Sequence, residues 1–395
     1  FPTEPVPWPA DGTPRVAGVS SFGFGGTNAH VVVTEAPRAA APDGRAARPC
    51  HLLALRARTD EALRALAGRY ADYLAAHPSA DLHDVCFTAN TGRAAQPVRL
   101  TWVAERTDDV IECLREAAAA VRPSGAYRTN GHRDDGPRVA FLFSGQGAQY
   151  PGMAGELAEH VPVFRRHLEH AAAAFEGHLD APLLPLLLDA GADARLLAQT
   201  PCTQAALFVF ETALAALWRS LGVTPDVVLG HSLGEIAAAC AAGTLSVADA
   251  AFLVARRGRL MDGTPTDAAM VVALADAATV LPFLLPFERE VSVAAVNGPA
   301  NTVVSGREAA VAAIVRALSE SGIETRRLDV SRAFHSPLMD PVVAPLGRVL
   351  DASMPQPLRV PLISAVDGRL REAGERLPHD HWGRHARAPV RFADA

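Results

Sequence analysis

Lysine is absent from the 395-residue sequence, so all 37 strongly basic side chains are arginine. Any site for an anionic ligand must therefore use the planar guanidinium group, which binds a carboxylate through two parallel hydrogen bonds. The formal net charge is -6, and the sequence pI is about 6.2. This acidic balance argues against nucleic acid as a partner, because nucleic-acid-binding proteins carry a clustered basic surplus.

Cysteine is scarce, and none of the five residues forms a C-x-x-C pair with another. This spacing argues against a disulfide framework and a zinc site, and it fits a reducing cytoplasm. No apolar run is long enough to span a bilayer, and the N-terminal residues do not resemble a signal peptide. We therefore expect a soluble, cytoplasmic protein without a bound metal and without a membrane partner. The cysteines are Cys50, Cys86, Cys113, Cys202 and Cys240.

Length and composition predict two or three domains, because 49% of the residues are hydrophobic and can fill more than one core. The Ala-, Pro- and Arg-rich stretch 38–50 is typical of a linker. From 51 to 122 the pattern predicts a small α/β unit, with a helix capped at Thr59 or Asp60. This unit carries no reactive cluster, so we interpret it as a spacer. Residues 123–136 are predicted to be a polar loop.

A glycine-rich segment at 18–30 reads G-V-S-S-F-G-F-G-G-T-N-A-H and leads into a β-branched strand at 31–33. Glycine-rich loops before a strand can resemble phosphate-binding loops. This segment has neither the lysine nor the following helix that such a loop needs, so we reject nucleotide binding here.

The most informative stretch is Gly-His-Ser-Leu-Gly at 230–234, between the apolar run 226–229 and an alanine-rich helical pattern. Strand, tight turn and helix form the context of a nucleophile elbow, which makes Ser232 the candidate nucleophile. The glycines allow the strand and the helix to approach closely. Chance occurrence in a chain rich in Gly and Ala is the alternative explanation.

A second strand, predicted at 139–143, ends in Ser-Gly-Gln-Gly-Ala-Gln at 144–149. In open α/β sheets, ligands bind at the carboxyl ends of the parallel strands. We therefore assign the backbone N–H groups of Gln146 and Leu233 to an oxyanion hole beside the nucleophile. The alternative is a plain turn from strand to helix.

Between 269 and 328 the predicted order is strand, helix, strand, strand, helix, strand. This is the βαββαβ order of a ferredoxin-like unit, inserted into the larger domain. The chain then returns through Ala-Phe-His-Ser-Pro at 333–337. His335 is well placed to act as a fixed base, although a lone histidine is more often structural.

Taken together, several motifs resemble the acyltransferase domain of type I polyketide synthases and the malonyl-CoA:acyl-carrier-protein transacylases. The resemblance covers 138–395. It also identifies 18–30 as the end of a ketosynthase domain, in which His30 is not catalytic. The small α/β unit at 51–122 resembles the linker between ketosynthase and acyltransferase. The motifs are G-Q-G-A-Q at 145–149, T-Q at 203–204, G-H-S-L-G at 230–234, R-G at 257–258, V-N-G at 296–298 and A-F-H-S at 333–336.

The resemblance implies an α/β fold with an α/β-hydrolase-like large subdomain and an inserted ferredoxin-like small subdomain. The expected boundaries are 1–37 for the ketosynthase end, 38–136 for the linker domain, 137–267 with 333–395 for the large subdomain, and 268–332 for the small one.

The resemblance also implies a chemistry. Ser232, activated by His335, takes an acyl group from malonyl-CoA and passes it to the phosphopantetheine thiol of an acyl carrier protein. Such a task suits an imidazole that titrates near neutrality. Backbone carbonyls orient the base in this family, so no third carboxylate is expected. No cofactor is bound by the domain itself, and the partners are the carrier protein and the ketosynthase of the same polypeptide.

Further site residues follow from the same comparison. Arg257 matches the arginine that holds the free carboxylate of malonate. Phe334 and Leu233 match the malonyl-selective form, whereas Arg332 departs from it, because malonyl-selective domains commonly have histidine there. Residues that resemble those lining the site are Gln204, His231 and Asn297.

Two other readings of the sequence remain open. A serine hydrolase shares the elbow, but it needs an acidic residue as the third member of a triad, for which Asp262, Asp267 and Asp329 are available. A non-catalytic docking module is the second alternative.

Overall fold

The computed structural model describes residues 3–9, 11–36, 49–121, 123, 125–130, 138–351, 353 and 355–395. The chain divides into two compact units, residues 1–47 and 48–395. Most of the predicted linker at 38–50 lies outside the described residues. The finer division into four parts stays a prediction.

The first unit is a β-hairpin of β1 (Val16–Phe22) and β2 (Asn28–Thr34), paired antiparallel from Val16 opposite Thr34 to Phe22 opposite Asn28. The Gly23 N–H donates to the Thr27 carbonyl and closes the glycine-rich turn. The ring of His30 is bonded to Ser20 within this hairpin. The segment therefore forms a turn and a strand, and the described residues directly after it, 35–36, are not helical.

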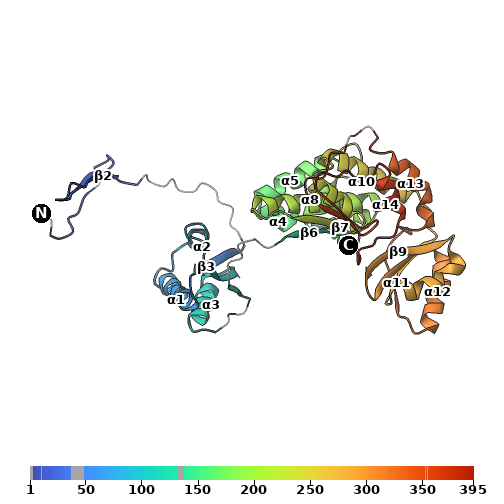
Figure 1. The fold of residues 1–395 in the computed structure, drawn as a ribbon, viewed down its shortest axis with the longest axis horizontal. Helices are drawn as coiled ribbons and strands as arrows, with labels where there is room; N and C mark the ends of the chain where they lie inside the picture. Colours follow the sequence, from blue (N-terminus) through green and yellow to red (C-terminus); the bar gives the residue numbers. More distant parts are fainter. Residues whose placement is uncertain are drawn as a thin grey trace. The chain divides into compact units, whose positions relative to one another are not determined.

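The second unit begins with a small antiparallel sheet in the order β3-β4-β5. Thr59 caps the first helix by accepting a hydrogen bond from the Ala62 N–H, as the sequence indicated. Helices α1 and α3 pack against each other (Figure 1). Side chains from the helices and the sheet form a separate hydrophobic core. The elements are β3 (His51–Ala57), α1 (Asp60–Ala76), α2 (Leu82–Thr91), β4 (Val98–Ala104), α3 (Thr107–Ala118) and β5 (Tyr127–Asn130).

Strand β5 corrects one prediction. The segment 123–136 was expected to be a polar loop, but Tyr127–Asn130 pairs with β4. Its polar composition fits an edge strand, which needs no alternating apolar pattern when one side faces solvent. Residues 131–137 of the predicted loop lie outside the described residues.

The large subdomain contains a second sheet, in the order β13-β12-β7-β6. Strands β6, β7 and β12 are parallel, and β13 runs antiparallel at the edge. The carboxyl ends of β6 and β7 therefore lie side by side, which places the loop at 144–149 next to the elbow. The strands are β6 (Ala140–Phe143), β7 (Val227–Gly230), β12 (Leu362–Ser364) and β13 (Arg369–Arg371).

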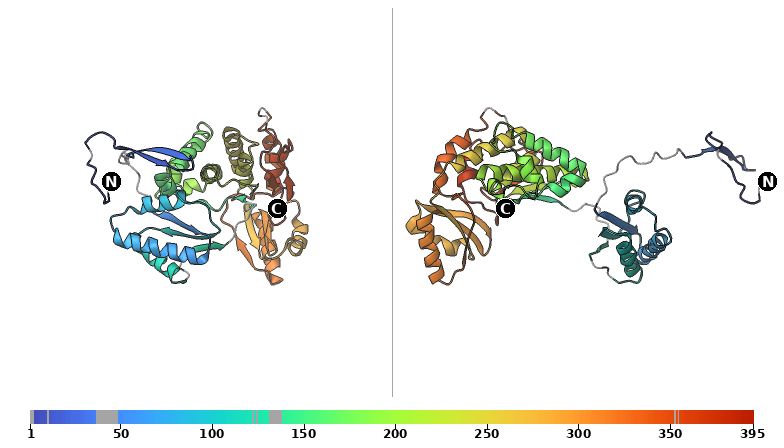
Figure 2. Two further views of the ribbon diagram at one scale, coloured as in Figure 1. Left: turned by 60° about the vertical axis from the view of Figure 1, so that its left-hand side comes forward. Right: turned by 180° about the vertical axis from the view of Figure 1, so that it is seen from behind.

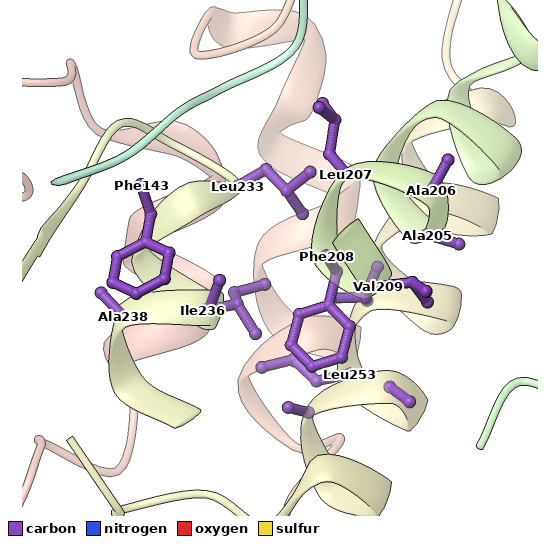
Figure 3. Packing of buried hydrophobic residues seen from close by; sticks show 14 of the residues in the cluster. Phe143, Ala205, Ala206, Leu207, Phe208, Val209, Leu233, Ile236, Ala238 and Leu253 are labelled. Atoms are coloured by element: carbon purple, nitrogen blue, oxygen red, sulfur yellow. The ribbon is translucent and has the colours of Figure 1, made fainter. Parts of the chain in front are cut away.

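Helices bury this sheet in the main core. Phe208 of α8, Ile236 of α9 and Leu253 of α10 pack together, and Leu233 points from the elbow toward Leu207 (Figure 3). The helices are α4 (Gly155–His160), α5 (Pro162–Ala173), α6 (Leu183–Leu188), α7 (Ala194–Leu197), α8 (Thr200–Ser220), α9 (Gly234–Ala241), α10 (Val247–Asp262), α13 (Asp340–Gly347) and α14 (His381–Arg387).

Helix α8 corrects the expectation that no apolar run in the sequence is long enough to span a bilayer. By length and composition it is the one helix in the described part of the chain that is able to cross a membrane. However, 67% of its most apolar window is buried inside the protein, where it contacts α5, α9 and α10. It is therefore a core helix, and its apolar character is explained by the burial of most of its surface.

The small subdomain has the predicted βαββαβ order and an antiparallel sheet in the order β11-β8-β10-β9. Helices α11 and α12 contact this sheet and each other (Figure 1). The elements are β8 (Ala268–Ala273), α11 (Ala277–Leu284), β9 (Val291–Gly298), β10 (Asn301–Arg307), α12 (Glu308–Glu320) and β11 (Thr325–Arg327).

Strand β8 belongs to two cores at once. Ala269 and Val271 pack under α11 and α12, whereas Met270 and Val272 on the other face belong to the core of the large subdomain. Because successive side chains of a strand point to opposite faces, a strand buried on both faces must be apolar throughout. All six residues of β8 are indeed buried.

Backbone hydrogen bonds also join the two subdomains. The Val296 N–H donates to the Val390 carbonyl, and the Val390 N–H donates to the Ala294 carbonyl. In both rotated views the small subdomain, drawn in orange, stays beside the helices of the C-terminal segment, drawn in red (Figure 2). The C-terminal segment around Val390 thus connects the large subdomain to strand β9 of the small sheet.

The tight contact of β10 with β9 generates a stability prediction. A Cβ atom at Gly306 would lie 2.3 Å from the Glu290 carbonyl oxygen and 2.7 Å from the Val291 Cα atom. We expect Gly306→Ala to lower the free energy of unfolding by about 3 kcal/mol, because backbone must move to accommodate the methyl group. Urea denaturation of both proteins measures this difference.

Gly347→Ala is the matched control, since no atom lies within 4 Å of a Cβ built there. We expect its free energy of unfolding to stay within about 0.5 kcal/mol of the wild type. Equal stability of Gly306→Ala and wild type would mean that β9 and β10 are packed more loosely than described.

Candidate active site

The elbow forms because two glycines permit close backbone contacts: Gly230 lets β7 approach the start of α9, and Gly234 lets α9 approach the end of β6. A Cβ atom at Gly230 would lie 2.1 Å from the Glu235 nitrogen, and one at Gly234 would lie 2.4 Å from the Phe143 carbonyl oxygen. Ser232, at the apex, has a φ of 49°, a left-handed conformation that is strained for a non-glycine residue. Its side chain is thereby presented at the carboxyl ends of β6 and β7.

The hydroxyl of Ser232 has two partners. Its Oγ lies 2.8 Å from His335 Nε2 and 3.0 Å from Arg257 Nη2. The Arg257 guanidinium can only donate, so it donates to Oγ, while the Oγ–H can donate to an unprotonated Nε2. The structure thus brings together three side chains from separate parts of the sequence.

His335 is held by its backbone and by its second ring nitrogen. It has a φ of 57°, and its carbonyl accepts a hydrogen bond from Ser292 Oγ at 2.7 Å. Nδ1 lies 2.8 Å from the Ala388 carbonyl oxygen. Because a carbonyl only accepts, Nδ1 carries the proton and Nε2 is left free to accept one.

A backbone carbonyl therefore occupies the position of the acidic residue in a Ser-His-Asp triad. Among the described residues, none of the three candidate acids is hydrogen-bonded to His335. Asp262 is paired with Arg332, and Asp267 with Arg307. This arrangement disfavours the triad that a serine hydrolase of the α/β-hydrolase type requires.

Arg257 lies on α10 and is 1% exposed. In the part of the chain that the structure describes, it forms no ion pair, and its Nε and Nη1 atoms have no hydrogen-bond partner. Burial lowers the pKa of Arg257 to about 9, so it stays charged at neutral pH. A buried charge without a counter-charge is costly unless a ligand supplies one.

Burial also changes the pKa of the candidate base, His335. It lowers the pKa of His335 to about 3, and the positive charge of Arg257 acts in the same direction. The sequence-based expectation of an imidazole that titrates near neutrality is therefore wrong for the unliganded protein. The reason is tertiary, because the ring is 4% exposed and faces a guanidinium rather than a carboxylate.

The loop after β6 lies against the elbow. A Cβ atom at Gly145 would lie 2.9 Å from the His231 carbonyl oxygen, so glycine permits this contact. Ser144 donates from its N–H and its hydroxyl to Oε1 of Glu211, which anchors the start of the loop. Burial raises the pKa of Glu211 to about 7.

Gln146 follows in this loop, and its side chain accepts a hydrogen bond from Gln204 Nε2 at 3.0 Å. Gln204 is fully buried, and its Oε1 atom has no partner. Within the described residues, the backbone N–H groups of Gln146 and Leu233 donate no hydrogen bond. Both are therefore available to an acceptor in the site.

His231 and Asn297 join the elbow to the small subdomain. His231 Nε2 lies 2.8 Å from Asn297 Oδ1, and Asn297 Nδ2 donates to Asn301 Oδ1 at 3.3 Å. The polar atoms that sequence analysis assigned to substrate binding are thus bonded to each other. Phe334, next to His335, is buried in the main core.

Sequence analysis missed three buried residues beneath the elbow. Glu235 accepts hydrogen bonds from Ser364 Oγ and the Ala365 N–H, and its Oε1 lies 2.9 Å from His381 Nε2. His385 Nε2 lies 3.0 Å from the Ser232 carbonyl oxygen. The available signal was an acidic residue directly after the elbow together with two histidines four apart, which share one face of a helix.

No group of three or more His, Cys, Asp or Glu side chains suited to a metal ion occurs among the described residues. The site combines the Ser232 hydroxyl with the neutral imidazole of His335 and the guanidinium of Arg257. It also has two backbone N–H groups that donate no hydrogen bond within the described residues. This set suits acyl transfer, which needs a nucleophile, a base and donors for a developing oxyanion.

Comparisons with known proteins agree with this chemistry. A family model described as "Acyl transferase domain" matches residues 140–395, and one described as "CurL-like, PKS C-terminal" matches 51–114. Spectinabilin polyketide synthase system protein NorB of Streptomyces orinoci is 44% identical over 99% of this chain, which spans 18% of that protein. Mycoketide-CoA synthase of Mycobacterium tuberculosis is 39% identical over the whole chain, which spans 9% of it.

Solved structures give the same result. The acyltransferase domain from module 8 of the salinomycin polyketide synthase aligns with a TM-score of 0.76 and 32% identity, over 88% of this chain and 81% of that one. A malonyl-CoA:acyl carrier protein transacylase (FabD) from Xanthomonas oryzae pv. oryzae aligns with a TM-score of 0.59 and 32% identity, over 64% and 81%. The α/β fold expected from the sequence is thereby confirmed, and the chain belongs to the acyl transferase family, in which it is similar to the acyltransferase domains of polyketide synthases.

Proposed function

We propose that this domain moves a malonyl group from malonyl-CoA to Ser232, and from there to the phosphopantetheine thiol of an acyl carrier protein. The observation that carries the proposal is the unpaired, buried guanidinium of Arg257, whose Nη2 lies 3.0 Å from the Ser232 hydroxyl. A malonyl group has a free carboxylate that supplies the missing counter-charge, and it can bind the guanidinium through two hydrogen bonds.

In the first half-reaction, His335 Nε2 takes the proton of Ser232 as Oγ attacks the thioester carbonyl carbon. The carbonyl oxygen becomes an oxyanion, which accepts hydrogen bonds from the free N–H groups of Gln146 and Leu233. When the carbon–sulfur bond breaks, the CoA thiolate receives the proton from His335. The products are free CoA and a malonyl ester of Ser232.

The second half-reaction reverses the roles. His335 takes the proton of the carrier thiol, the sulfur attacks the ester carbonyl, and the same two N–H groups stabilise the second oxyanion. Ser232 leaves as an alkoxide and regains its proton from His335. The hydrogen bond from His335 Nδ1 to the Ala388 carbonyl keeps the ring oriented through both steps.

Arg257 also links substrate recognition to reactivity. In the unliganded protein its Nη2 donates to the same oxygen that must attack, which makes that oxygen a weaker nucleophile. A substrate carboxylate competes for the guanidinium and offsets its charge, one of the causes that lower the pKa of His335. Acyl groups without a carboxylate leave both effects in place, so the site should discriminate against acetyl groups.

Phe334 supports malonyl over methylmalonyl. It is 7% exposed and directly precedes the base, and we propose that its phenyl ring occupies space that an α-methyl group would need. Rejection of one methyl group in this way is worth about 1–3 kcal/mol, or roughly 10- to 200-fold. We propose that Gln204, His231 and Asn297 complete the wall of the site.

The partners follow from the same reaction and from the relatives, which are large polyketide synthases. We propose an acyl carrier protein as acceptor and a ketosynthase of the same polypeptide as neighbour, with no resident cofactor, nucleic acid or membrane partner. The five cysteines are free, which fits a cytoplasmic location.

The proposal is tested by intact-protein mass spectrometry after brief incubation with malonyl-CoA, methylmalonyl-CoA and acetyl-CoA in competition. We expect a malonyl adduct on Ser232, in excess over methylmalonyl by roughly 10- to 200-fold, and complete discharge by a carrier protein. Ser232→Ala should give no adduct. If Ser232→Ala still loaded the carrier, the domain would be a docking module, and release of free malonate faster than transfer would make it a hydrolase.

Substitution of Arg257 tests carboxylate recognition. We expect Arg257→Ala to lower kcat/KM for malonyl-CoA by roughly 100- to 1000-fold, since two charge-assisted hydrogen bonds are lost. Acylation by acetyl-CoA should rise relative to malonyl-CoA, because the Ser232 oxygen is no longer engaged. Burst kinetics with both substrates measures the two values.

Arg259→Ala is the matched control, because Arg259 lies on the same helix, is partly exposed and pairs with Asp180 at 3.4 Å. Its kinetic constants should equal those of the wild type. Equal losses for malonyl and acetyl groups in Arg257→Ala would instead make Arg257 a purely structural residue.

The pH dependence follows from burial of the base. The pKa of His335 is lowered from 6.5 to about 3, so the free enzyme keeps a neutral base well below neutrality. We expect kcat/KM for acylation to be flat between about pH 8 and pH 5. Over the same range the unfolded chain binds protons that the buried ring does not, so the free energy of unfolding should fall as the pH drops below 6.5.

Stopped-flow acylation, with circular dichroism at each pH to confirm folding, measures this profile. A loss of activity with a midpoint near the ordinary imidazole pKa would contradict the burial of His335.

A further inference from the structure

Three buried ionisable side chains beneath the elbow take no part in the mechanism above. Glu235, His381 and His385 are 0%, 2% and 3% exposed, respectively. Glu235 comes from the first turn of α9, and the two histidines come from α14. Glu235 and His381 bond to each other, whereas His385 reaches the backbone of the nucleophile.

The atom that His385 contacts is the carbonyl oxygen of Ser232, at 3.0 Å from Nε2. This oxygen also accepts a hydrogen bond from the Glu235 N–H at 2.8 Å. The Ser232 carbonyl and the Leu233 N–H belong to one planar peptide unit, in which they point in opposite directions. Any group that fixes the carbonyl therefore fixes the direction of the N–H.

The tautomer of His385 follows from its contacts. A carbonyl oxygen only accepts, so Nε2 carries the proton, and the neutral ring leaves Nδ1 as a bare acceptor. Nδ1 is indeed buried and has no partner among the described residues. Burial keeps the pKa of His385 well below its usual value, so the ring stays neutral. A buried acceptor without a donor is costly, so the cost at Nδ1 must be offset by another contact of the ring. The hydrogen bond from Nε2 to the Ser232 carbonyl is such a contact.

We infer that His385 is a positioning residue for the oxyanion hole, which acts through the Ser232–Leu233 peptide. Its hydrogen bond holds this peptide plane at a residue with a strained φ of 49°. It also withdraws electron density from the carbonyl, which makes the Leu233 N–H a stronger donor. The inference rests on the proposed function, since it assigns the Leu233 N–H to the oxyanion of the acyl transfer.

Two features keep His385 in place. Oε2 of Glu235 lies 3.9 Å from His385 Nε2, on the side of the ring that carries the proton. The indole of Trp382 meets the His385 ring edge to face, with centroids 5.5 Å apart. Leu233 itself is fully buried, so its side chain anchors this peptide in the core (Figure 3).

The test compares His385→Phe with His385→Gln, whose side-chain amide can donate to the same carbonyl. With malonyl-CoA labelled with ¹³C at the thioester carbon, the acyl-serine carbonyl is followed by infrared difference spectroscopy. We expect His385→Phe to move this band to higher frequency and to slow acylation roughly 10- to 100-fold with an unchanged Kd for malonyl-CoA. His385→Gln should restore the band and most of the rate.

His381→Phe is the matched control, one turn earlier on α14 and equally buried, but bonded to Glu235 and not to Ser232. It should lower the melting temperature and leave the carbonyl band unchanged. A band shift in His381→Phe as large as that in His385→Phe would mean that any damage to this core moves the carbonyl, and the inference would fail.

A measurement on the wild-type protein does not depend on the folding of variants. With ¹⁵N-labelled histidine, NMR should find His385 neutral, with the proton on Nε2. A proton on Nδ1 instead would overturn the inference, because Nε2 could not then donate. If the wild type forms no acyl-serine, the proposed function itself fails; if it does, and His385→Phe has the same band and rate, only the role of His385 is rejected.

Discussion

The site depends on two close backbone approaches, of β7 to α9 at Gly230 and of α9 to the end of β6 at Gly234. Because no side chain separates strand from helix, Ser232 is forced into a left-handed conformation at the apex. One turn of backbone then serves three purposes. It presents a hydroxyl to the base and the guanidinium, it leaves the Leu233 N–H without a partner, and it directs the Ser232 carbonyl down toward His385.

The site contains a buried positive charge that is not balanced by a negative charge from the described part of the chain. Arg257 is buried without a counter-charge among the described residues, and His335 and His385 are neutral because burial and the guanidinium both lower their pKa values. The buried side chain of Glu235 beneath the elbow is already bonded to a hydroxyl, an N–H and His381. Among the described residues, the Arg257 guanidinium is therefore left without a carboxylate partner.

Local features could be predicted from the sequence, and long-range ones could not. The elbow, the Thr59 cap and the βαββαβ order depend on residues near one another in the chain, so their patterns are visible. Strand β5 was missed because an edge strand needs no alternating pattern. The pKa of His335 is low because the ring is buried and faces Arg257, which is more than 70 positions away in the sequence. His385 and Ser232 are also more than 70 positions apart. No local pattern encodes burial or contacts over such separations.

Strand β8 has a consequence for the evolution and engineering of such domains. Since Met270 and Val272 fill the core of the large subdomain while Val271 fills that of the small one, the two subdomains share one strand as a common wall. A small subdomain transplanted from a relative would bring the wrong surface to a core that is not its own. Substrate preference in this architecture is therefore more easily changed by single side chains at the mouth of the site than by exchange of the inserted unit as a cassette.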